Sequence, residues 1–179
     1  MKLSDRFDLF HLLMLALALG GALVLGFSGS GSSAVVTGTS RQLEQDLAYR
    51  ARIAFLRDVY APVEELMTQG RDQQALLKLA EIARRYPGEG YGLLLRGRIL
   101  HRLGAVEQAA AAYAEAVRKN PDFVDAQAPL SARQEIAALL ETELQPVRQR
   151  AVGQGKSPSA RRALSDLRYL QSRLAGGCE

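Results

Sequence analysis

Apolar and polar positions follow one another along much of this chain with the spacing of amphipathic helices. Small or apolar residues recur every three or four positions from Arg71 to Pro87 and again from Ala105 to Pro121. Both runs stop at a proline, which lacks the amide hydrogen that a continuing helix needs. The pattern therefore predicts two helices of similar length, each ended by a proline.

The two runs belong to an internal repeat with an offset of 34 residues. The residues Gly70, Ala75, Leu79, Ile82 and Pro87 recur as Gly104, Ala109, Tyr113, Ala116 and Pro121. This offset is the period of a helix-turn-helix repeat. In these residues the chain resembles the tetratricopeptide repeat (TPR) family. The resemblance implies two helical hairpins, at about residues 56–89 and 90–123, and a role in holding other proteins.

The match to the family is better in the second unit, where Gly97 and Ala109 stand where the helices approach closely. It departs at Leu93, where the family usually has an aromatic residue, and at Arg96, where it has a leucine. In the first unit Pro62 falls inside the first helix, so we expect a kink or break near Tyr60 and a second segment that reaches residue 69.

The resemblance also implies a concave surface, lined by the first helix of each hairpin, as the partner-binding site. Its residues by position are Arg57, Tyr60, Glu64 and Met67 from the first unit, and Tyr91, Leu94, Arg98, His101 and Arg102 from the second. Arg98 and Arg102 lie four apart on one helical face, where they could bind a partner's carboxylate. The alternative, two arginines that only face solvent, stays open.

Helices are expected on both sides of the repeats, which are too few to bury their apolar faces alone. Thr39 and Gln42 form a capping-box pattern that predicts a helix start near Ser40. We expect the apolar face of this helix to be buried against the repeats. Its residues are Leu43, Leu47, Ala51, Ala54, Phe55 and Val59.

A second capping-box pattern, Ser131 with Gln134, predicts a capping helix at about residues 131–151, which completes a helical domain of residues 40–151. Residues 152–179 are expected to form an amphipathic basic helix and a tail. Seven basic residues oppose two acids from residue 145 onwards. This part either grips an acidic partner or anionic lipid, or shows water an ordinary charged helix face.

An apolar run without a charge covers residues 9–27, which is close to the length that a helix needs to cross a bilayer. We favour a retained transmembrane anchor over a cleaved signal peptide, although the small residues that follow would also allow cleavage. Residues 28–39 are polar and glycine-rich, and they predict a flexible linker. Ala18, Ala22 and Gly26 lie four apart, as a strip that packs on another membrane helix or faces lipid.

Lys2 and Arg6 precede the apolar run, whereas the first basic residue after it is Arg41. Basic flanks stay on the cytoplasmic side, so residues 1–8 are expected in the cytoplasm. For a bacterial chain this predicts a single-pass protein of the inner membrane with a periplasmic C-terminal domain.

The amino-acid composition predicts the fold class and argues against nucleic acid as a partner and against a disulfide. The chain is rich in Ala, Leu, Arg, Glu and Gln, which are strong helix formers, so the domain is expected to be all-α. The net charge of +4 is modest, and no dense basic stripe with aromatic residues suggests nucleic acid. The one cysteine, Cys178, excludes a disulfide within the chain.

No catalytic or metal-binding spacing accompanies the two histidines, His11 and His101. We therefore expect no enzymatic activity, cofactor, metal or small-molecule substrate. The first hypothesis is a membrane-anchored adaptor or assembly factor for protein partners, and the alternative is a non-catalytic accessory subunit of a multisubunit membrane complex, such as a respiratory or translocation complex.

Overall fold

The computed structural model describes residues 33–153 and 157–176 of the 179-residue chain. The predicted span 9–27, with Ala18, Ala22 and Gly26, lies outside these residues, and so does Cys178. Among the described residues, no helix is both long and apolar enough to cross a membrane. The chain divides into two units, residues 1–51 and 52–179.

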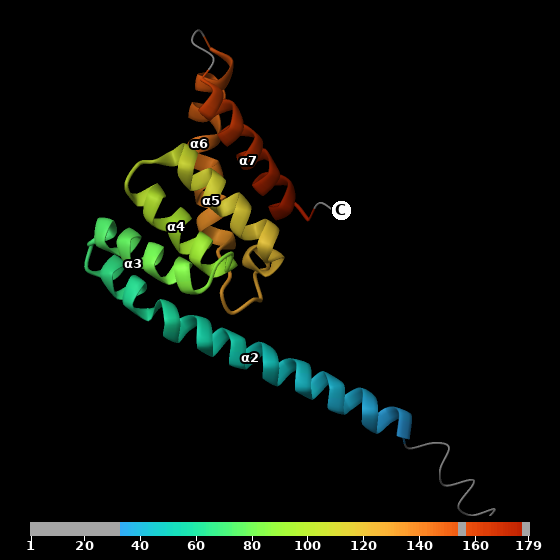
Figure 1. The fold of residues 1–179 in the computed structure, drawn as a ribbon. Helices are drawn as coiled ribbons and strands as arrows, with labels where there is room; N and C mark the ends of the chain where they lie inside the picture. The colour runs from blue at the N-terminus through green and yellow to red at the C-terminus, as the bar shows by residue number, and fades with distance from the viewer. Residues whose placement is uncertain (1–32, 154–156, 177–179) are drawn as a thin grey trace, which may run out of the picture. The chain divides into compact units, whose positions relative to one another are not determined.

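The described residues are helical throughout, apart from the connections, and contain no strand, which confirms the all-α prediction. The helices are α2 (Ser33–Thr68), α3 (Asp72–Arg85), α4 (Gly90–Arg102), α5 (Val106–Lys119), the 3₁₀ turn η1 (Pro121–Val124), α6 (Arg133–Val152) and α7 (Pro158–Leu174). Figure 1 shows α4 to α7 packed side by side, and α6 and α7 run antiparallel to each other.

The two hairpins bend at the same kind of turn. Gly70 and Gly104 have φ angles of +72° and +74°, in the left-handed region that favours glycine. At the first bend the amide of Arg71 donates to the carbonyl of Leu66 at 2.9 Å, and at the second the amide of Ala105 donates to Leu100 at 2.9 Å. This bonding satisfies carbonyls that a helix end would leave unpaired. The shared glycines of the sequence are therefore helix-ending turns.

The predicted start of α2 is wrong, and the break that was one of the two expectations near Tyr60 is absent. The helix begins at Ser33, not near Ser40, so residues 33–39 of the predicted linker are helical. Extending an existing helix adds one hydrogen bond per residue without a new nucleation step. No break occurs near Tyr60 either, because α2 continues through Pro62 to Thr68. Buried Tyr60 and Val63 on either side of the proline offset its one lost hydrogen bond.

The predicted buried face of α2 is also only partly right. Leu43 and Leu47 are 60% and 57% exposed, and Phe55 is 48% exposed. Among the residues of this helix from 41 onwards, the first buried side chain is Leu56. The apolar residues of this helix therefore extend further towards its N-terminus than its buried residues do.

One hydrophobic cluster runs through the hairpins and the two C-terminal helices. It includes Val63 of α2, Leu94 of α4, Val117 of α5, Ile136 of α6 and Leu167 of α7, all fully buried. The flanking helices thus complete the core that the two hairpins cannot close alone.

Helix α7 is fixed to α5 by its polar edge as well. Arg118 of α5 pairs with Asp166 at 2.9 Å and lies over the ring of Tyr169, 4.6 Å from its centre. Such exposed contacts each contribute about 0.5–1 kcal/mol or less. The packing of Leu167 and Leu170, both fully buried, therefore contributes more to holding α7 in place.

Candidate functional site

Four of the predicted concave-surface residues belong to the core. Tyr60, Met67, Tyr91 and Leu94 are 1%, 5%, 4% and 0% exposed, so they are not available to a partner. Tyr91 packs on Tyr60 and Phe123, with ring centres 5.4 Å and 6.4 Å apart, and donates to Glu64, so side chains of the domain itself fill this part of the face. The first helix of each hairpin carries large apolar side chains, and a short array must cover them with its own chain.

The predicted carboxylate-binding arginines are already paired within the chain. Arg98 donates to both oxygens of Glu135 on α6, with Nε–Oε2 at 2.8 Å and Nη2–Oε1 at 2.6 Å. Arg102 lies 3.3 Å from the carboxylate of Asp72 and donates to the Met67 carbonyl at 2.9 Å. The two side chains do bind carboxylates, as expected of arginine, but those of their own domain.

The structure brings four of the predicted residues into one small polar pocket of about 460 Å³, which Pro129 and Leu130 also line. Tyr91 donates to the carboxylate of Glu64, and Arg57 donates to the Pro129 carbonyl at 3.4 Å. The pocket residues from the predicted set are Arg57, Glu64, Tyr91 and Arg98. His101, half-buried, and Arg102 lie outside it. The polar groups of this pocket thus mostly satisfy one another.

A larger groove of about 500 Å³ lies between α3 and α5, with α4 as its floor. The apolar lining consists of Leu76, Leu79, Ala80 and Ala83 from α3, and Leu93 and Leu100 from α4. Leu76 and Leu93 are half-buried, so part of this apolar surface is open to water. A groove of this volume is within the range of ligand-binding pockets in proteins.

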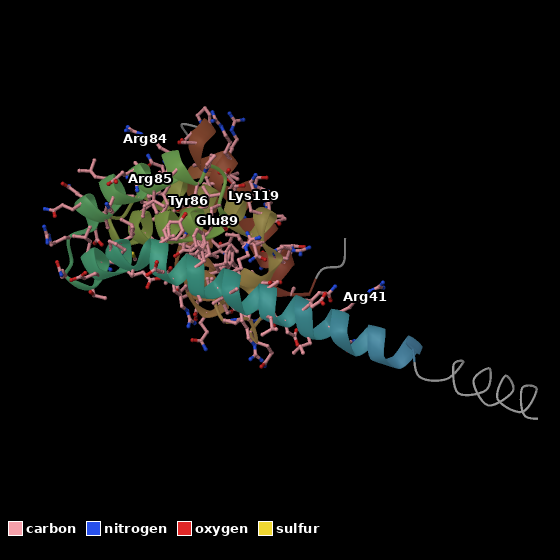
Figure 2. The ribbon with its side chains drawn as sticks, turned by 60° about the horizontal axis from the view of Figure 1, so that its bottom comes forward. Arg41, Arg84, Arg85, Tyr86, Glu89 and Lys119 are labelled. Carbon is pink, nitrogen blue, oxygen red and sulfur yellow. The ribbon has the colours of Figure 1, made fainter. Side chains whose placement is uncertain are left out.

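The end of the groove is shaped by aromatic residues and a close helix approach. Tyr60 lies beneath Gly92, where an added Cβ would come within 2.7 Å of the tyrosine hydroxyl oxygen. Tyr86 forms one wall and stacks edge-on against Phe55, with ring centres 5.5 Å apart. Figure 2 shows Tyr86 close to Glu89 at the turn between α3 and α4, where Glu89 pairs with Arg52 at 3.3 Å.

The rim of the groove carries polar side chains that have no partner in the described part of the chain. Arg96 of α4 and Gln108 and Glu115 of α5 are exposed, and none forms a hydrogen bond or ion pair with another described residue. Unpaired polar groups around an apolar floor are the usual features of a binding site. The groove, not the predicted face, is therefore the candidate site.

Sequence reasoning missed this groove, although one signal pointed to it. Leu93 and Arg96, the two departures from the repeat pattern, both line the groove. A smaller side chain at the first position and a charged one at the second leave open the space that an aromatic residue and a leucine would fill. The two positions that depart from the repeat's packing pattern are thus the positions at which this surface has a hollow.

Burial affects the proton affinity of three tyrosines around these sites. It raises the pKa of Tyr60 to about 12, with a further contribution from the charge of Glu89. Burial also raises the pKa of Tyr91, assisted by its hydrogen bond to Glu64, and that of Tyr113, assisted by the charge of Glu135. For Arg98, burial acts to lower the pKa, but the hydrogen bond and charge of Glu135 outweigh it and raise the pKa.

These tyrosines predict alkaline instability. The folded chain holds their protons more tightly than the unfolded chain, where the ordinary pKa is 10.0. Their contribution is fully present below pH 10 and is lost as the pH rises from 10 towards 12. Urea unfolding across this range is expected to show a falling free energy of unfolding. The decline should flatten when Tyr60, Tyr91 and Tyr113 are all replaced by phenylalanine.

The matched control replaces the exposed Tyr86 by phenylalanine. An equal decline in the triple variant and in this control would assign the alkaline loss to groups other than the buried tyrosines.

No cluster of three or more potential metal ligands is present among the described residues. In comparisons with known proteins, the chain matches no protein-family model, no curated protein and no solved structure.

Proposed function

We propose that this protein is a membrane-anchored interaction module that holds a segment of a partner protein in the groove between α3 and α5. The observation that carries the proposal is the open apolar floor of the groove, with unpaired Arg96, Gln108 and Glu115 at its rim. The resemblance of the two hairpins to tetratricopeptide repeats supports a protein partner, and the apolar run at residues 9–27 supports the membrane anchor.

The chemistry of the groove describes the segment that fits it. Leu76, Leu79 and Leu93 offer contacts for one or two apolar side chains, each worth about 1.5–3 kcal/mol when fully removed from water. Arg96 can donate to a carboxylate or carbonyl, and Glu115 can accept from an amide or a cation. An amphipathic helix or short extended segment meets these requirements.

Filling the groove tests the proposal. Ala83 is exposed and lines the groove, so Ala83→Trp places a large ring in it without removing a core side chain. The tagged full-length chain is isolated from its native membranes in mild detergent, and the co-purifying proteins are quantified. We expect a protein held by the parent chain to fall at least tenfold in the Ala83→Trp variant.

The matched control is Ala61→Trp, at an exposed alanine that lines the small polar pocket. It is expected to retain the partner. Loss with Ala61→Trp but not with Ala83→Trp would place the partner on the face predicted from the repeat resemblance and overturn the groove as the site. A partner at fixed stoichiometry would indicate the accessory subunit, and varied clients would indicate the adaptor.

A further inference from the structure

The end of the α6–α7 hairpin carries a cluster of positive charge, here called the basic tip. Helix α6 ends at Val152 and α7 begins at Pro158, and Figure 1 shows the two ends together at the top of the view. The basic tip consists of Arg148 and Arg150 on α6 and Arg161 and Arg162 on α7, all exposed. The sequence contains no acidic residue from 144 to 165.

The arginines of the basic tip are unpaired, unlike the arginines that join one helix of the domain to another. Arg98 and Arg118 are each bound to a carboxylate of another helix. None of the four tip arginines forms a hydrogen bond or ion pair with a described residue. Glu107 and Asp166 line the hollow between α5 and α7 beside Arg150 and Arg162, but Asp166 is already paired with Arg118. The tip therefore keeps a net positive charge.

An apolar side chain lies at the same end of the hairpin. Val152, the last residue of α6, is 70% exposed. Cations combined with an exposed apolar side chain are the features of surfaces that lie at the lipid headgroups, where arginine binds phosphate and the apolar group enters the interface.

We propose that the basic tip binds an anionic lipid surface. A bilayer presents a continuous layer of phosphate groups. A cluster of arginines can therefore bind it without acidic partner groups at matching positions. The proposed anchor at residues 9–27 would hold the chain at a bilayer and so raise the local concentration of the tip there, which allows a weak contact to suffice. The proposal uses the anchor only for this proximity and does not depend on the groove.

A fluorescent probe at the tip tests the contact. In a Cys178→Ser chain, Val152→Cys is labelled with a nitrobenzoxadiazole dye, whose emission rises when it leaves water. The full-length chain is reconstituted into vesicles of phosphatidylcholine alone or mixed with phosphatidylglycerol. We expect at least a twofold rise in emission with phosphatidylglycerol, and we expect high salt to reverse it because salt screens exposed charges.

Two controls make the result specific. A probe at Leu77→Cys, on the 73% exposed Leu77 of α3, should not respond to phosphatidylglycerol. The variant with Arg148, Arg150, Arg161 and Arg162 all changed to glutamine should lose the response at residue 152, and because these residues are exposed it should keep its helical circular dichroism.

The proposal is overturned if the probe at residue 152 reports the same emission in both vesicles, or if the glutamine variant responds like its parent. Unchanged emission would leave an acidic protein surface as the partner of the tip. Flotation of the chain with pure phosphatidylcholine vesicles tests the anchor separately. Failure of the anchor is thus distinguishable from failure of the tip, and neither result bears on the groove.

Discussion

Replacing Leu94 by alanine is expected to lower the free energy of unfolding by about 2–5 kcal/mol. Leu94 is 0% exposed and belongs to the main hydrophobic cluster, which contains residues from α2 to α7. Removing its branched end takes apolar atoms out of close packing and leaves a cavity that the helices around it fill only in part. Urea unfolding of the full-length chain in detergent, followed by far-ultraviolet circular dichroism, measures the change.

The matched control is Leu77→Ala, the same substitution at a leucine that is 73% exposed. Its effect is expected to stay within about 0.5 kcal/mol, as for most surface changes. The comparison separates two descriptions of α4. Equal small effects at both positions would return Leu94 to the partner-binding surface that the repeat resemblance implies and would contradict the core described above.

The elements that sequence reasoning located well are those fixed by local rules. Gly70 and Gly104 lie at helix ends with positive φ, where glycine is favoured, and α3 and α5 end just before Pro87 and Pro121. The amphipathic helix expected within residues 152–179 corresponds to α7, Pro158–Leu174. Each of these features depends on residues within one turn of helix.

Features that depend on distant residues could not be located in this way. Arg98 and Glu135 are 37 residues apart, and Arg118 and Asp166 are 48 apart, with no period that relates the partners. Which face of α4 is buried depends on the packing of the whole core, which no local pattern specifies. Four of the nine residues expected on the exposed face are therefore buried: Tyr60, Met67, Tyr91 and Leu94.

The groove also depends on residues that are distant in the sequence, so the candidate binding site could not be located from local patterns. Leu93 and Arg96 were visible as departures from the pattern, but only the packing of α3 beside α4 and α5 shows that both line one hollow. The repeat also relates Arg118, which holds α7, to Arg84 on α3, which is exposed and has no ion pair among the described residues. The outer side of α5 is thus covered by α7, while the groove side of α3 is left open to a partner.

Gly97→Ala is expected to destabilise the domain by about 1–3 kcal/mol, although alanine normally favours a helix over glycine by about 1 kcal/mol. An added Cβ at residue 97 would lie 2.9 Å from Cγ and 3.0 Å from Cδ2 of the Tyr113 ring. Tyr113 is 1% exposed, so its ring has no free space to move into, and α4 and α5 would have to separate. Thermal and urea unfolding of the full-length chain measure the loss.

A double-mutant cycle shows whether the clash with Tyr113 is the cause. In a Tyr113→Leu background the ring is gone, and Gly97→Ala should then cost at least 1 kcal/mol less than it does in the parent chain, or become stabilising. The same cost in both backgrounds would mean that residue 97 acts through the backbone alone. A smaller cost with leucine would establish the close approach of α4 and α5 as the contact that requires glycine.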